Sequence, residues 1–182
     1  SIDSVMVGAQ LITALQSIVS RSIDPLESAV VSICEFHAGN ARNVIPQTAE
    51  LRGTIRALTP EVRALVGKRL TEVVEGAARM TGARIDLNIE RGYPVVVNHE
   101  AQTDVAIRVA KQVAGDGNVH EMPPLMGGED FAYMLEQRPG AFIFCGNGDS
   151  AGLHHPAYDF NDAAIVYGTS YWIKLVENTL AA

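Results

Sequence analysis

The chain has 182 residues, of which 47% are hydrophobic and 19% are charged, and its formal net charge is −7. This length allows one solid core or two small ones, and the composition is ordinary for a soluble globular protein. The negative charge argues against nucleic acid or an anionic membrane as a partner, and no apolar run approaches the ~20 residues that cross a bilayer. The chain starts at Ser1 without a methionine and opens directly into a helical pattern, which suggests a fragment or a processed chain.

The first half of the chain predicts an antiparallel sheet covered by two helices, which is an α+β layer. Apolar residues at spacings of three and four predict the helices, and alternating or β-branched residues predict the strands. The elements expected are helices over 3–20 and 60–81 and strands over 29–39, 50–58 and 84–90. The first helix is expected to have one apolar stripe, made of Val5, Ala9, Ile12, Leu15 or Gln16, and Val19. Thr59 is the expected N-cap of the second helix, and Gly82 suits the left-handed position that ends it.

The pattern changes near residue 95, where glycine- and proline-rich connections begin. Helices are expected over 100–114 and 163–180, and the continuous apolar run 141–145 is typical of a strand buried on both faces. We therefore expect two domains, residues 1–94 and 95–182, of which the second resembles half a domain. Cys34 and Cys145 lie inside predicted strands and are expected to be buried in a protein of a reducing compartment, the cytoplasm.

The stretch LHHPAYDFND holds His154 and His155 side by side. One of them could bind a metal, with its ring oriented by Asp159 or Asp162. The alternative is a surface turn before Pro156, which is the more common arrangement. A catalytic zinc site needs about three protein ligands, and the remaining histidines form no recognisable ligand spacing with this pair.

Two further stretches carry weaker signals. In MGGED, Gly127 and Gly128 permit either a positive φ or a close backbone approach to a ligand. The Glu129 that follows could be an ordinary carboxylate at the start of a helix. In ARNVIP, Asn43 lies between two predicted strands, where it could present its amide to a substrate or simply occupy a turn.

Four segments in order, NVIP…AELRGTIR, MGGEDFAYML, PGAFIFCGNG and LHHPAYDFND, resemble the C-terminal half of the dinuclear-metal amidohydrolases. This is the aminoacylase and carboxypeptidase family that includes hippurate hydrolase and the indoleacetyl-amino-acid hydrolases. The resemblance implies a ferredoxin-like lid and dimerisation domain with its first strand missing, followed by the C-terminal part of an α/β metallohydrolase domain. It also implies a homodimer that hydrolyses N-acyl amino acids with water activated by two divalent ions, zinc or manganese.

By the same resemblance His154 matches a metal ligand, Asn43 reaches toward the substrate, in some relatives across the dimer, and Gly127 and Gly128 line the substrate pocket. No catalytic residue is assigned, because the family's general base and its other metal ligands lie in motifs upstream of Ser1. We therefore expect the chain to be inactive by itself. The alternative is a naturally truncated dimerisation or binding module that performs no catalysis.

Overall fold

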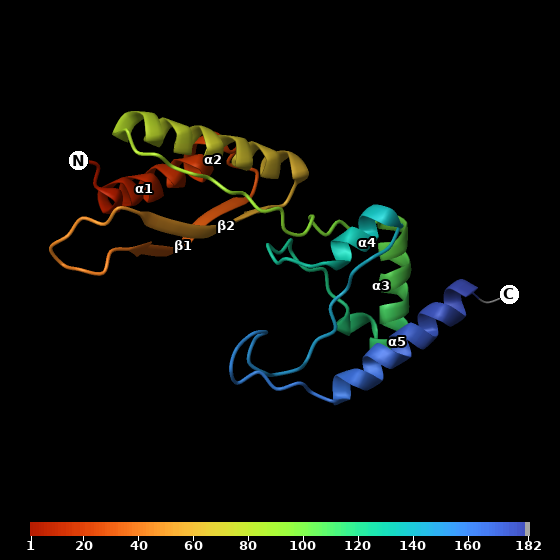
Figure 1. Ribbon diagram of the computed structural model, residues 1–182. Helices are drawn as coiled ribbons and strands as arrows, with labels where there is room; N and C mark the ends of the chain where they lie inside the picture. Colours follow the sequence, from red (N-terminus) through yellow and green to blue (C-terminus); the bar gives the residue numbers. More distant parts are fainter. Residues whose placement is uncertain (181–182) are drawn as a thin grey trace. The chain divides into compact units, whose positions relative to one another are not determined.

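A computed structural model describes residues 1–180 as a mixed α/β protein made of two compact units (Figure 1). The first unit comprises Ser1–Val95 together with Pro124–Gly128, and the second comprises Val96–Pro123 together with residues from Glu129 onward. No helix within residues 1–180 combines the length and the apolar character needed to span a membrane.

The first unit contains helix α1 (Ser4–Ser22), strands β1 (Ala29–Ala38) and β2 (Ala49–Ala57), and helix α2 (Pro60–Thr81). The predicted boundaries of α2 are confirmed. The Thr59 hydroxyl accepts a hydrogen bond from the Val62 amide at 3.3 Å, and Gly82 ends the helix with a φ of 71°. Asp3 caps α1 in the same way, because its carboxylate accepts from the Val5 and Met6 amides.

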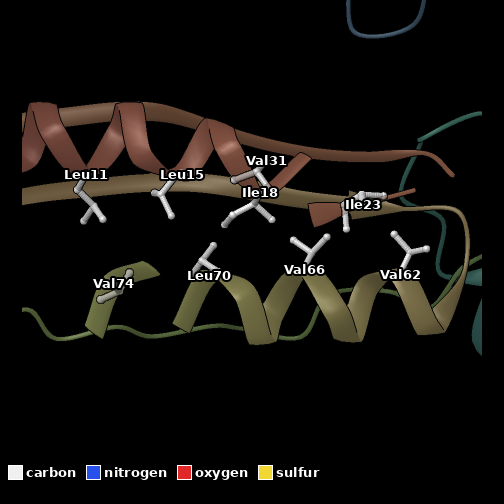
Figure 2. Close-up of a cluster of buried hydrophobic side chains, with 9 residues drawn as sticks. All are labelled: Leu11, Leu15, Ile18, Ile23, Val31, Val62, Val66, Leu70 and Val74. Carbon is white, nitrogen blue, oxygen red and sulfur yellow. The ribbon is translucent and has the colours of Figure 1, made fainter. Parts of the chain in front are cut away.

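The two strands form an antiparallel hairpin in which Val31 pairs with Ile55, and its register shifts between Ile33 and Glu35. The core lies between this hairpin and the two helices (Figure 2). Its buried members are Leu11, Leu15, Ile18, Ile23, Val31, Val62, Val66, Leu70 and Val74. The predicted stripe of the first helix was right in its second half, where Leu15 is buried and Val19 packs against the core, and wrong at its start, since Val5 is 41% exposed. That helix is apolar on more than one side, so its spacing also fitted a neighbouring stripe.

Two predicted strands are absent from the described residues. The segment 84–90 has no regular structure, although Ile85 packs against the core, and 141–145 is irregular with Phe144 exposed. A strand exists only when a second strand accepts and donates its backbone hydrogen bonds, and neither segment has such a neighbour. Cys34 and Cys145 are exposed free thiols, so their predicted burial was also wrong.

The second unit is built from helices α3 (Glu100–Ala114), α4 (Phe131–Gln137) and α5 (Ala163–Leu180) and one 3₁₀ turn, η1 (Asp116–Asn118). Helices α3 and α5 pack together. We call the apolar face that α5 leaves exposed the α5 stripe. It consists of Ile165, Val166, Trp172, Ile173, Val176 and Leu180. These side chains fall within about a third of the helix circumference, beside the half-buried Tyr171 and Leu175.

Candidate functional site

The two adjacent histidines lie in two successive β-turns of the second unit. The His155 amide donates to the Gly152 carbonyl at 3.1 Å, and the Tyr158 amide donates to the His155 carbonyl at 2.9 Å. His154 is the third residue of the first turn and has a φ of 66°. A β-turn in which only the third residue has a positive φ is a type II turn. Glycine or asparagine is the usual residue at that third position.

His154 is the only non-glycine residue with a positive φ among residues 1–180. This left-handed conformation costs an L-residue roughly 1–2 kcal/mol, and such strain concentrates at functional positions. The neighbouring Pro156, by contrast, occupies the second position of its turn, where proline is favoured. The backbone therefore singles out the first histidine of the pair.

The side chains of the pair also differ. The Nδ1 atom of His155 accepts a hydrogen bond from the Ala157 amide at 3.1 Å, so that ring supports its own turn. The His154 ring is exposed, and within residues 1–180 neither Asp159 nor Asp162 hydrogen-bonds to it. The structure confirms the surface turn, and within this turn the His154 ring is exposed.

A complete metal site is not present in this part of the protein. No three histidine, cysteine or acidic side chains within residues 1–180 lie close enough together to hold an ion. A catalytic zinc takes about three protein ligands, and a dinuclear centre takes more. The described residues therefore do not fit a dinuclear centre by themselves, and His154 could supply one ligand to it.

Asn147, which sequence reasoning did not single out, ties together the two ends of the loop that carries His154. Its Nδ2 donates to the Asp159 carbonyl at 2.7 Å and to the Ser150 hydroxyl at 2.9 Å. Its Oδ1 accepts from the Asn161 amide at 2.8 Å. No local pattern predicts bonds that span 12 and 14 residues; the only signal was an asparagine between two glycines.

Gly127 and Gly128 belong to the first unit, where two arginines hold the surrounding backbone. Arg56 of β2 donates to the Met126 carbonyl, and Arg63 of α2 donates to the Gly92 and Tyr93 carbonyls at 3.1 Å each. A Cβ atom on Gly128 would lie 3.3 Å from the Tyr93 ring, whereas one on Gly127 would meet nothing within 4 Å.

Of the two reasons considered for these glycines, the positive φ was wrong, since neither glycine has one. The other reason, a close approach to a ligand, stays a prediction; at Gly128 the close neighbour is the aromatic ring of Tyr93. The Glu129 carboxylate accepts a hydrogen bond from the Phe131 amide at 3.1 Å. This is the ordinary role of a carboxylate at the start of a helix.

Asn43 is exposed in the loop of residues 39–48 that joins β1 and β2, where it lines an open hollow. This loop extends from the Ala38–Ala49 end of the hairpin, and Arg56 lies near the other end, opposite Val30. Ala49 and Arg56 are seven steps apart along the strand, or about 23 Å at ~3.3 Å per residue. The structure therefore does not bring Asn43 together with Gly127 and Gly128.

Comparison with known proteins places almost the whole chain in one family. Residues 5–178 match the model of peptidase family M20/M25/M40. The chain is 38% identical to hippurate hydrolase of Campylobacter jejuni, covering 95% of the chain and 45% of that enzyme. It is also 38% identical to N-acetylcysteine deacetylase of Bacillus subtilis, covering 96% of the chain and 46% of that enzyme.

A solved structure has the same fold. The YXEP protein of Bacillus subtilis, described as a dinuclear metal binding peptidase of the M20 family, superposes with a TM-score of 0.78 at 33% identity. The superposition covers 98% of this chain and 46% of that protein. The chain thus spans less than half the length of the relatives that it matches.

Proposed function

Because this chain belongs to peptidase family M20/M25/M40, we propose that it is part of a hydrolase that cleaves the amide bond of N-acyl amino acids. The match over residues 5–178 carries the proposal, since it includes all four segments that resemble the amidohydrolases. Relatives named hippurate hydrolase and N-acetylcysteine deacetylase support an N-acyl amino acid as the substrate.

In this proposal the active protein uses two divalent ions, zinc or manganese, and His154 binds one of them. When bound, the ions supply an activated water for attack on the amide carbonyl. The structure supports His154 over His155, because its ring is free of local hydrogen bonds and its backbone is held in a strained conformation. The other ligands and the general base would come from protein outside this chain, so we propose that the chain alone is inactive.

Asn43, Gly127 and Gly128 contact the substrate in our proposal, but not in the same copy of the site. Asn43 lies at the opposite end of the hairpin from the backbone that surrounds the two glycines. A substrate the size of an N-acyl amino acid cannot bridge about 23 Å of strand. We therefore propose a homodimer in which Asn43 of each subunit reaches the site of its partner. The exposed free thiols of Cys34 and Cys145 fit a reducing compartment such as the cytoplasm.

The test compares the product of the complete reading frame with its His154→Ala and His155→Ala variants. Metal content is measured by elemental analysis, and turnover is measured with hippurate and with N-acetyl amino acids. We expect His154→Ala to lose metal and turnover, whereas His155→Ala keeps both. Equal losses in the two variants would contradict the role of His154.

The alternative, a truncated binding module, predicts a different result. The reading frame upstream of Ser1 would then lack further histidine and acidic motifs, and its product would neither retain stoichiometric metal nor hydrolyse any N-acyl amino acid. A protein that binds two ions per subunit and turns over substrate would exclude that alternative.

A further inference from the structure

The loop that carries His154 has little apolar burial to hold its shape. Every residue from 152 to 157 is exposed, and Tyr158 is only partly covered. A loop of this kind keeps a single conformation only through hydrogen bonds, since apolar burial does not offset the conformational entropy that ordering the loop costs. The question is therefore which hydrogen bonds join its ends.

Within residues 1–180, the hydrogen bonds that join the two ends of this loop all involve the side chain of Asn147. Its Nδ2 donates to the Asp159 carbonyl at 2.7 Å and to the Ser150 hydroxyl at 2.9 Å. Its Oδ1 accepts from the Asn161 amide at 2.8 Å. One amide group therefore uses both of its N–H donors and its oxygen. Other hydrogen bonds inside the loop are local and span at most three residues.

Asn161, which donates its amide to Asn147, is itself hydrogen-bonded to the start of α5. The Oδ1 atom of Asn161 accepts from the Ala163 amide at 3.0 Å, at the first residue of α5. Asn147 thus connects the start of the loop to the beginning of a helix of 18 residues. A loop fixed at both ends to such an element samples fewer conformations than one that is tethered by the chain alone.

We propose that Asn147 is a positioning residue, which closes the loop from 147 to 159 and thereby holds His154 in its left-handed turn. Among residues 1–180 no hydrogen bond joins Asn147 to the His154 ring, so Asn147 would act on that ring through the backbone. The importance of this for hydrolysis rests on the proposed function, whereas the closure of the loop does not. A ligand that is held in place before it binds loses less entropy on binding.

The test uses the 182-residue chain and two measurements, amide hydrogen exchange of the segment 152–160 and the NMR signals of the His154 ring. Asn147→Ala should raise exchange in that segment at least ~10-fold, because the three hydrogen bonds of its amide are lost together. Asn147→Asp keeps the acceptor for the Asn161 amide and loses the donors, so it should give an intermediate rate. The His154 signals should shift or broaden in the same order.

Asn98→Ala is the matched control. Asn98 also joins distant backbone through its amide, since it donates to the Phe142 carbonyl at 2.9 Å and accepts from the Phe142 amide at 2.8 Å. It should raise exchange around residue 142 and leave 152–160 unchanged.

Unchanged exchange at 152–160 in Asn147→Ala would overturn the proposal. So would an equal rise in Asn98→Ala, which would indicate general loosening of the second unit. Neither measurement requires metal or turnover. A failed hydrolase assay would therefore count against the proposed function alone, and a failed loop assay would count against the role of Asn147 alone.

Discussion

Replacing His154 with glycine should stabilise the second unit relative to replacing it with alanine, although glycine normally destabilises. Both substitutions remove the imidazole, but only glycine relieves the φ of 66°. The left-handed conformation destabilises alanine at this position by about 1–2 kcal/mol. Glycine avoids this cost, but its greater freedom in the unfolded chain destabilises the folded state by about 0.5–1 kcal/mol relative to alanine. The net advantage of glycine over alanine at 154 is therefore between about 0 and 1.5 kcal/mol.

Position 155 supplies the internal control, because its φ is negative. There alanine should be more stable than glycine by about 0.5–1 kcal/mol, which reverses the order. Both substitutions lose the hydrogen bond from the Ala157 amide equally. The glycine-versus-alanine difference in the free energy of unfolding should thus change by about 1–2 kcal/mol between positions 154 and 155.

The assay is urea unfolding followed by fluorescence of Trp172, the single tryptophan of the chain, which lies on α5 of the same unit. Four variants are compared, with glycine and alanine at 154 and at 155. If alanine is the more stable choice at both positions by the same margin, the strained turn does not exist in solution. The argument that links backbone strain to the role of His154 would then fail.

Three further outcomes follow from the packing. Leu15→Ala should lower the free energy of unfolding by about 2.7–5 kcal/mol, measured as faster amide exchange in α2. Leu26 is 94% exposed, so Leu26→Ala should change it by no more than about 0.5 kcal/mol, and equal effects of the two substitutions would contradict the described core. Gly128→Ala should raise proteolytic cleavage around its own loop, because the new Cβ meets an aromatic ring at 3.3 Å, whereas Gly127→Ala should not. More cleavage in Gly127→Ala than in Gly128→Ala would refute this packing. Burial raises the pKa of Tyr171, so the folded chain holds that proton more tightly. The stability that this contributes is complete below pH ~10 and is lost as the pH rises through the raised pKa, and Tyr171→Phe should flatten the alkaline decline in unfolding midpoint.

Elements with local signals could be predicted from the sequence. Thr59 and Gly82 marked both ends of α2 because capping depends on residues within one turn of the helix end. The alternation of residues 50–58 also predicted β2 and the face on which Leu51 and Ile55 pack against the core. The segments at 84–90 and 141–145 have the composition of strands, but a strand also requires a neighbouring strand, which composition does not supply.

The sequence singles out the residues of the candidate site, but it does not predict how they are arranged. The pair of histidines was evident, but a type II turn with His154 at its third position departs from the usual residue preference, so no pattern could predict it. Asn147 was missed because its partners lie 12 and 14 residues away. The separation of Asn43 from Gly128 follows from the strand register, which becomes known only when the hairpin is seen.

The α5 stripe determines how this chain can be studied. Trp172 is 64% exposed in it and Leu180 is 75% exposed, so a folded molecule presents a continuous apolar surface along one helix. Dyes that fluoresce on apolar surfaces, commonly used to detect partly folded proteins, will bind this surface in the native state. A dye-based melting curve will start from a high signal and will report the loss of that surface together with the unfolding of the core. Circular dichroism or amide exchange avoids this, because neither signal depends on dye binding to the α5 stripe.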